Sequence, residues 1–134
     1  MSTATLEAPN SAARAKQKVI LCEGNEAAAL GVALARPDMV AVYPITPQSS
    51  LVEHVAKLIA DGRMDADIVD AEGEHSVLSV LQGGALAGAR TYTATCGPGL
   101  AFMFEPYFRT SGMRLPIVMS IVTRDGITPQ SVWG

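Results

Sequence analysis

Four groups in this sequence have the residue types that acid–base and anion-binding chemistry requires. They are the Thr46 hydroxyl, the Glu74 carboxylate, the backbone amides of the loop 95–99 and the Arg124 guanidinium. A guanidinium, a hydroxyl and amides bind a small anion, and a carboxylate can transfer a proton. Each group follows an apolar run of strand length, so all four can meet at one edge of a parallel sheet. That edge is our predicted site, and Glu74 is its predicted working group.

The elements that would bring these groups together alternate between short apolar runs and longer helical segments. Apolar runs bounded by Gly, Pro and Asp predict strands, and Ala- and Leu-rich segments predict helices. We expect Pro106 to kink the last helix. The repeated strand–helix order predicts an α/β fold, a doubly wound and mostly parallel sheet with right-handed crossovers and helices on both faces. The predicted strands are 18–22, 39–43, 67–70, 91–95 and 115–122. The predicted helices are 27–36, about 50–60, one that has Glu72 and Glu74 at its start and runs to about residue 88, and about 99–111.

The sequence divides into a short leader and one domain. Residues 1–17 are rich in Ala, Ser and Thr and lack the apolar core of a signal peptide, which predicts a disordered leader. Residues 18–134 predict a single domain. After the last predicted strand, residues 127–134 contain no closing helix, so we expect the natural polypeptide to continue further.

Composition and charge argue against several classes of protein. The 134 residues are 49% hydrophobic and 17% charged, which is typical of a well-buried globular domain. The net charge of −3 gives no support to nucleic-acid binding, and no apolar run approaches the length of a membrane span. Because Cys22 and Cys96 are far apart, we expect neither a disulfide nor a metal site formed by this chain alone, and we place the protein in the cytoplasm.

Each candidate residue also has a simpler interpretation. Glu72 and Glu74 stand in the first turn of a predicted helix, where a carboxylate stabilises the helix dipole by roughly 0.3–1 kcal/mol. Gly97 and Gly99 follow a strand as phosphate-binding glycines do. However, Phe102 occupies the place of a third glycine, which favours a tight turn instead. Taken singly, these residues leave the function open.

Four sequence blocks, taken together and in order, resemble one family. The likeness is to the N-terminal, pyrimidine-binding domain of the α subunit of the 2-oxoacid:ferredoxin oxidoreductases, and it covers about residues 18–134. It implies a thiamine diphosphate enzyme that oxidatively decarboxylates a 2-oxoacid to an acyl-CoA and passes electrons to ferredoxin or NAD. The blocks are Tyr43-Pro44-Ile45-Thr46-Pro47, Glu72-Gly73-Glu74, Thr93-Ala94-Thr95-Cys96-Gly97-Pro98-Gly99-Leu100 and Thr123-Arg124.

The resemblance also implies a role for each candidate residue. The Glu74 carboxyl would hydrogen-bond N1′ of the cofactor's aminopyrimidine and favour the imino tautomer, which can remove the proton from the thiazolium C2. Thr46 and Arg124 would hold the oxoacid carboxylate, the arginine through its bidentate guanidinium. Gln48 and His75 depart from the usual residues of the family, and either is a candidate for touching substrate. The cofactor contacts would come from Glu74, Thr95, Cys96, Gly97 and Gly99.

Part of the active site that the resemblance implies is missing from this sequence. It has no Gly-Asp-Gly followed by Asn-Asn, the pattern that binds the diphosphate and its Mg²⁺, and no cysteine pattern for an iron–sulfur cluster. The resemblance therefore implies three partners: a pyrophosphate-binding β subunit, a γ subunit and an iron–sulfur subunit. These would supply Mg²⁺ and 4Fe–4S clusters, and this chain alone is expected to be inactive.

Two questions stay open at the level of sequence. The clustered aromatic residues Phe102, Phe104, Tyr107 and Phe108 fit a subunit interface or a core, whereas a pocket for an aromatic oxoacid such as phenylglyoxylate is the sharper hypothesis. The competing functions are a non-oxidative thiamine decarboxylase or synthase half, and a non-catalytic nucleotide-binding scaffold module. The first of these does not typically carry the Tyr-Pro-Ile-Thr-Pro block.

Overall fold

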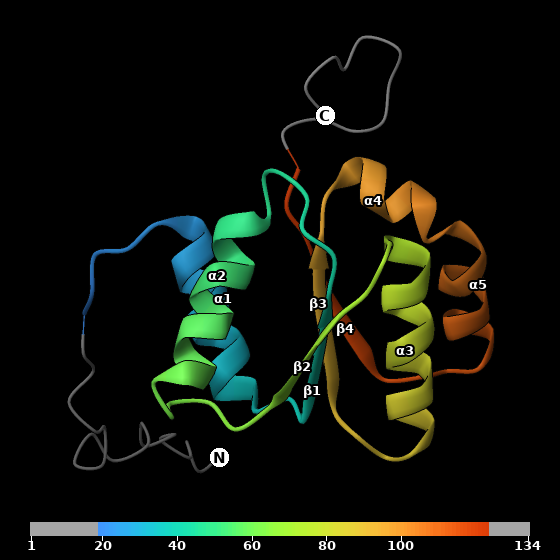
Figure 1. Cartoon of the computed structure of the whole chain (residues 1–134), viewed down its shortest axis with the longest axis horizontal. Helices are drawn as coiled ribbons and strands as arrows, with labels where there is room; N and C mark the ends of the chain where they lie inside the picture. The colour runs from blue at the N-terminus through green and yellow to red at the C-terminus, as the bar shows by residue number, and fades with distance from the viewer. Residues whose placement is uncertain (1–18, 124–134) are drawn as a thin grey trace, which may run out of the picture.

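A parallel sheet of four strands forms the centre of the described structure, a computed structural model that covers residues 19–123 (Figure 1). The strands are β1 (Met39–Val42), β2 (Asp67–Asp70), β3 (Thr91–Thr95) and β4 (Ile117–Ile121). Their order across the sheet is β2-β1-β3-β4, and every neighbouring pair is parallel. The carboxyl ends of all four strands therefore lie at one edge of the sheet, which we call the carboxyl edge.

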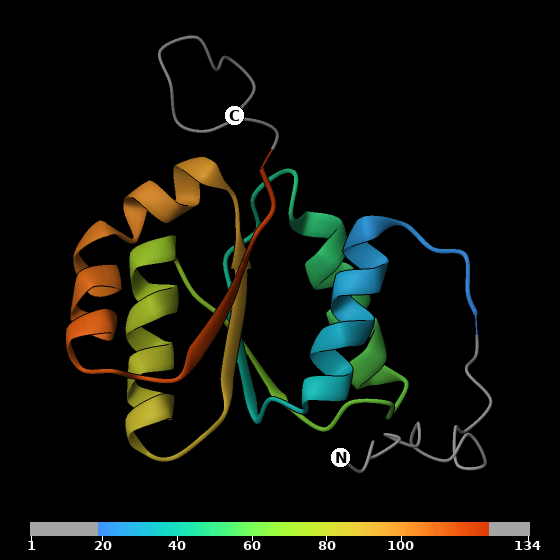
Figure 2. The ribbon, with the colours of Figure 1, turned by 180° about the vertical axis from the view of Figure 1, so that it is seen from behind.

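Two helices, α1 (Gly24–Ala35) and α2 (Ser49–Ala60), pack side by side on one face of the sheet (Figures 1 and 2). Successive side chains of a strand point to opposite faces, so alternate residues of β1 and β3 meet these helices. The core on this face combines helix and strand residues that are buried; among them are Val40, Val42, Leu51, Val55, Tyr92 and Ala94.

Three helices cover the opposite face: α3 (Glu74–Leu86), α4 (Gly97–Phe102) and α5 (Phe104–Gly112). Helix α3 lies close to the sheet because Gly84 has no side chain. A Cβ there would stand 3.0 Å from the Met39 sulfur and 3.1 Å from Thr91 Cγ2. The buried core of this face consists of Ala41, Val77, Leu78, Leu81 and Met103.

The direction in which the chain crosses the sheet reverses at β1. From β1 the chain passes through α2 to β2, and from β2 it passes through α3 to β3 on the other side of β1. Helices α2 and α4, which follow the neighbouring strands β1 and β3, consequently lie on opposite faces (Figure 1). Open α/β sheets bind ligands at such a switch point, in the crevice outside the carboxyl ends. The topology therefore directs attention to the loops that follow β1 and β3.

The structure confirms the predicted α/β class, with a doubly wound parallel sheet, and four of the predicted strands. The predicted strand 18–22 is wrong: residues 19–22 form no strand, and Val19 and Leu21 are exposed. An apolar run becomes a strand only where a neighbour satisfies its backbone hydrogen bonds. Within the described part of the chain, no fifth strand lies beside β2 or β4.

The predicted helix over 99–111 is in fact two helices, α4 and α5, which are separated at Met103. Proline lacks an N–H, and its ring clashes with the carbonyl of the residue four positions earlier. For Pro106 that carbonyl belongs to Phe102, the last residue of α4, so the disturbance expected from the proline appears one turn before it. After the break α5 runs beside α3 (Figure 1), and the buried Gln82 amide of α3 donates a hydrogen bond of 2.7 Å to the Pro106 carbonyl.

The ends of the chain that the sequence assigned to a leader and to a continuing polypeptide lie outside the described residues. The described residues begin at residue 19 and end at residue 123. Between these limits, none of the helices is both long and apolar enough to cross a membrane.

Candidate functional site

Glu74 is a buried carboxylate at the carboxyl edge. Strand β2 ends at Asp70, three residues form a turn, and Glu74 is the first residue of α3. Only 7% of Glu74 is exposed. Because α3 crosses behind β1 to reach β3, the first turn of this helix carries Glu74 toward the segment that follows β3.

Gly99 brings the backbone of α4 directly against Glu74 and Thr95. A Cβ placed on Gly99 would stand 2.0 Å from Thr95 Oγ1, which is a severe overlap, and 3.0 Å from Glu74 Oε1. Thr95 is the last residue of β3. Three segments that are distant in sequence therefore meet here, and only glycine allows the approach.

Two polar groups at this contact have no partner among the described residues. The Thr95 hydroxyl oxygen is fully buried and makes no hydrogen bond there, and no group within residues 19–123 donates a hydrogen bond to the Glu74 carboxylate. A buried polar group without a partner costs about 1–3 kcal/mol, and such groups are rare in folded proteins. A ligand with hydrogen-bonding groups could bind here and supply the partners that the Glu74 carboxylate and the Thr95 hydroxyl lack.

The rest of the turn after β3 is also buried. Cys96 and Gly97 have little or no exposed surface, and the Cys96 carbonyl accepts a hydrogen bond of 2.9 Å from the Leu100 N–H. Helix α4 has six residues, and its two glycines, Gly97 and Gly99, are both buried. The tight-turn interpretation of the glycine pair therefore fits better than the phosphate-cradle interpretation.

Thr46 lies in the loop that follows β1, which comprises residues 43–48. Because β1 and β3 are neighbours, this loop and the turn after β3 border the switch point from its two sides (Figure 1). Thr46 is exposed, and the peptide bond between Thr46 and Pro47 is cis. The structure thus places the Thr46 hydroxyl at the predicted edge, open to a ligand, but gives no contact between it and Glu74.

Two amide side chains hold this loop, and the sequence alone did not assign them that task. The Asn25 amide, from the first turn of α1, donates hydrogen bonds to the Pro47 carbonyl at 3.1 Å and to the Ser50 hydroxyl at 2.7 Å. The Gln48 amide donates to the Tyr43 carbonyl at 2.8 Å. Gln48 is completely buried, and its amide oxygen has no hydrogen-bond partner among the described residues. The bond to Tyr43 gives Gln48 a structural role, and a contact with substrate stays a prediction.

The other polar residues near the start of α3 are exposed. The Ser76 hydroxyl donates a hydrogen bond of 2.5 Å to Glu72, and this bond, with smaller contributions from the Glu72 backbone and His75, lowers the pKa of the Glu72 carboxyl. The His75 ring lies 3.1 Å from a Glu105 carboxylate oxygen, and Arg109 lies 3.3 Å from the other oxygen. His75 therefore links α3 to α5 at the surface. Glu72 precedes the N-cap Gly73, so Glu74 is the acidic residue of the first turn of α3.

Arg124 lies outside the described residues. Its predicted role in binding a carboxylate therefore stays a prediction. In the part of the chain that the structure describes, no group of three or more His, Cys, Asp or Glu side chains is arranged to hold a metal ion.

The clustered aromatic residues form an exposed surface on α4 and α5, which we call the aromatic patch. Its four members are between 45% and 70% exposed, and the Phe104 and Phe108 rings meet edge to face at 4.9 Å. Side chains this exposed among residues 19–123 fit an interface better than a pocket formed by these residues alone. The patch comprises Phe102, Phe104, Tyr107 and Phe108.

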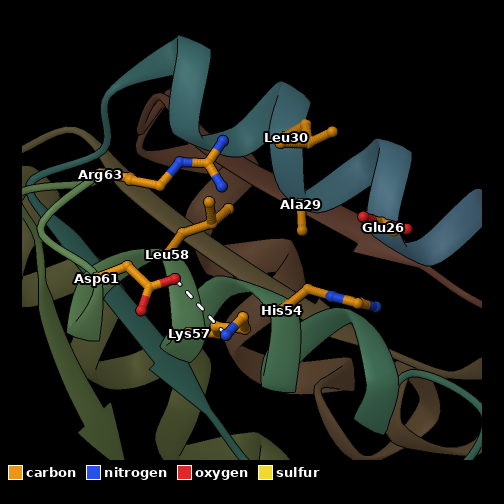
Figure 3. A pocket seen from close by; sticks show the side chains of 8 residues that line it. All are labelled: Glu26, Ala29, Leu30, His54, Lys57, Leu58, Asp61 and Arg63. Atoms are coloured by element: carbon orange, nitrogen blue, oxygen red, sulfur yellow. Dashed lines mark ion pairs between the residues drawn. The ribbon is translucent and has the colours of Figure 1, made fainter. Parts of the chain in front are cut away.

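A small hollow of about 70 Å³ between α1 and α2 contains none of the predicted site residues (Figure 3). Its polar groups carry both signs of charge, and Lys57 and Asp61 form an ion pair at 3.6 Å. His54 lines it as a half-buried helix residue. The hollow has room for a few water molecules, and nothing in its mixed charges selects a ligand.

Comparison with known proteins gives this geometry a family context. Residues 30–134 match the family described as pyruvate flavodoxin/ferredoxin oxidoreductase, thiamine diphosphate-binding. The chain is 92% identical over its whole length to the α subunit of an NADH-dependent phenylglyoxylate dehydrogenase from Aromatoleum evansii. It is 47% identical, over 87% of its length, to the pyruvate synthase subunit PorA from Methanocaldococcus jannaschii.

A solved structure has the same fold. The 2-oxoglutarate:ferredoxin oxidoreductase from Magnetococcus marinus, with 2-oxoglutarate, coenzyme A and succinyl-CoA bound, matches 81% of this chain with a TM-score of 0.74 and 33% identity. The chain covers 19% of that protein and 32% and 30% of the two relatives above. It therefore spans about a third of the length of the curated relatives it matches.

Replacing Gly99 tests the close approach at the site. Gly99→Ala is expected to lower the free energy of unfolding of this chain by about 1–3 kcal/mol, because the new methyl group overlaps the Thr95 hydroxyl. In a Thr95→Ala background the same change should cost about 1 kcal/mol less, whereas a Thr95→Ser background, which keeps the oxygen, should give no relief. Urea denaturation measures all of these changes.

Gly112→Ala is the matched control, because no atom stands within 4 Å of a Cβ at that position. It should leave the free energy of unfolding within about 0.5 kcal/mol of the starting value. An equal cost of Gly99→Ala in all three backgrounds would show that Gly99 is not pressed against the Thr95 oxygen.

Proposed function

This chain belongs to the pyruvate flavodoxin/ferredoxin oxidoreductase family, in its thiamine diphosphate-binding part, and from that premise we propose a function for the whole protein. It is the α subunit of an enzyme that oxidatively decarboxylates a 2-oxoacid to an acyl-CoA. The observation that carries the proposal is the buried Glu74 carboxylate, which has no partner in the described chain and lies against Gly99 at the switch point of the sheet.

The residues at this contact fit one end of thiamine diphosphate. The aminopyrimidine of the cofactor presents ring nitrogens and an amino group, and the unpaired Glu74 carboxylate and Thr95 hydroxyl offer the complementary groups. Glu74 would hold a proton at the ring nitrogen N1′. Gly99 keeps a side chain from separating the two groups, and the buried turn at Cys96 and Gly97 would pack beside the ring.

Thiamine diphosphate, when bound, supplies a nucleophilic carbon that adds to the oxo carbon of the substrate and accepts the electron pair released with CO₂. The residues of this chain would bind and orient the cofactor and the substrate, whereas the reacting carbon belongs to the cofactor. The Thr46 hydroxyl, exposed beside the switch point, would bind the carboxylate of the oxoacid. Arg124 would join it as the bidentate partner.

Phenylglyoxylate is the substrate we propose, with coenzyme A as acyl acceptor and NAD as electron acceptor. The 92% identity to the α subunit of an NADH-dependent phenylglyoxylate dehydrogenase supports the oxoacid and NAD. The solved relative, which holds coenzyme A and succinyl-CoA, supports the acyl acceptor. Ferredoxin is the other acceptor that the family name allows.

We propose that partner subunits complete the active site. The diphosphate and Mg²⁺ would be bound by a β subunit, and a γ subunit and an iron–sulfur subunit with 4Fe–4S clusters would carry electrons away. Two relatives are themselves named as subunits, which supports such an assembly. The aromatic patch offers a docking face, since exposed Phe and Tyr side chains are enriched at interfaces. Both cysteines are free thiols, which agrees with a cytoplasmic enzyme.

Glu74→Gln in the assembled enzyme tests the proposal. Loss of a group that shares a proton with the cofactor is expected to lower kcat/KM for phenylglyoxylate by roughly 10²–10⁴-fold. Glu72→Gln is the matched control: the same chemical change two residues earlier, at an exposed carboxylate, should change kcat/KM by less than about twofold.

The measurement is NADH formation with phenylglyoxylate and coenzyme A. Full activity of Glu74→Gln would favour the non-catalytic scaffold, and decarboxylation by the intact enzyme without NADH formation or ferredoxin reduction would favour the non-oxidative thiamine enzyme.

Phe102→Ala and Phe104→Ala test whether the aromatic patch is an interface. We expect each variant to weaken assembly of the enzyme, measured by sedimentation, and to lower kcat/KM equally for phenylglyoxylate and pyruvate. Leu34→Ala is the control, because Leu34 is an even more exposed apolar residue, on α1. A loss confined to the aryl substrate, with assembly intact, would instead place these rings in a substrate pocket.

A further inference from the structure

We propose that Asn25 and Gln48 are positioning residues, which together fix the Thr46 hydroxyl where the oxoacid carboxylate binds. The inference rests on the proposed function, because it needs Thr46 to bind that carboxylate. It adds two residues that act on substrate binding without touching substrate, one of them from a helix that contributes nothing else to the site.

The loop between β1 and α2 has few means of holding its own shape. Pro44 and Pro47 have no N–H to donate, and they flank Thr46 closely on both sides. The backbone supplies one closing bond, from the Gln48 N–H to the Ile45 carbonyl at 3.1 Å. Carbonyls on either side of Thr46 therefore depend on side-chain donors.

Asn25 supplies the first of these donors from outside the loop. Its amide bridges the Pro47 carbonyl, at 3.1 Å, and the Ser50 hydroxyl, at 2.7 Å. Asn25 sits in the first turn of α1, which packs along α2. The bridge therefore ties the residue after Thr46 both to α1 and to the first turn of α2.

Gln48 supplies the second donor from inside the loop. Its amide donates to the Tyr43 carbonyl at 2.8 Å, and the side chain is completely buried. This bond closes the loop across its base, since Tyr43 directly follows β1 and Gln48 directly precedes α2.

Thr46 is exposed between these two fixed points. The Thr46 hydroxyl takes no part in the hydrogen bonds of Asn25 and Gln48, so it stays available to a ligand. These bonds hold the backbone on both sides of Thr46. Misplacing a binding group by about 1 Å can cost as much as 10²-fold in rate, so a loop that carries such a group gains from being held.

The test uses the full-length subunit assembled with its partners. Asn25→Leu removes the donor and keeps the approximate size of the side chain, and Gln48→Met does the same at the buried position. Each is expected to raise KM for phenylglyoxylate about three- to tenfold, the range of one lost hydrogen bond. KM for coenzyme A should stay unchanged.

A double-mutant cycle with Thr46→Val separates positioning from general destabilisation. If Asn25 acts through the Thr46 hydroxyl, Asn25→Leu adds nothing to KM for phenylglyoxylate once that hydroxyl is gone. Tyr92→Phe is the matched control: it removes another partly buried hydrogen bond, of 2.8 Å to Ser120, which joins β3 to β4 and involves no residue of the loop, and should leave both KM values unchanged.

The outcomes distinguish the inference from the proposed function. A rise in KM for phenylglyoxylate with Thr46→Val but not with Asn25→Leu or Gln48→Met overturns the inference and leaves the proposed function standing. Equal rises for both substrates, or an unchanged effect of Asn25→Leu in the Thr46→Val background, also overturn it. No effect of Thr46→Val itself counts against the proposed role of Thr46.

Discussion

The contact of the Gly99 backbone with Glu74 and Thr95 is the constraint on which the rest of the site depends. It requires α3 to lie close to the sheet, which Gly84 permits, and it requires α4 to begin directly after β3. The fully buried Met103 fixes the far end of α4 in the core. The cost of this arrangement is two polar groups that the described chain leaves without partners. Because buried polar groups in folded proteins are nearly always hydrogen-bonded, we expect a ligand to supply the hydrogen bonds that these two groups lack.

The two loops at the switch point are built in opposite ways. The turn after β3 is buried and held by close packing against glycine, whereas the loop after β1 is held by amide side chains and leaves Thr46 exposed. This division suits the two molecules of the proposed reaction: a cofactor ring that fills a buried contact, and a substrate carboxylate that enters from solvent. The exposed aromatic patch begins on α4, the helix that also carries Gly99, where a partner subunit of the proposed assembly would dock.

Much of this arrangement follows from the sequence, and the parts that do not have physical reasons. Apolar runs bounded by turn residues predicted β1 to β4 closely, because each of these runs has a neighbouring strand to pair with, whether it is buried in the centre of the sheet, as β1 and β3 are, or lies at an exposed edge, as β2 and β4 do. The same pattern failed for 18–22, since the sequence does not tell whether a neighbouring strand exists. The sequence places both Glu72 and Glu74 at the start of a helix, and only the folded structure shows that Glu72 is exposed before the helix and that Glu74 is buried in its first turn. Asn25 gave no signal because its partners lie 22 and 25 positions away. The strand order that creates the switch point is likewise a property of the folded chain.

The most direct measurement is a structure of the assembled enzyme with thiamine diphosphate bound. The account predicts the Glu74 carboxylate within hydrogen-bonding distance, about 2.6–3.2 Å, of the ring nitrogen N1′, with Thr95 and Gly99 lining the same pocket. A cofactor bound elsewhere, or a Glu74 side chain turned into open water with the aminopyrimidine held by other residues, would contradict it.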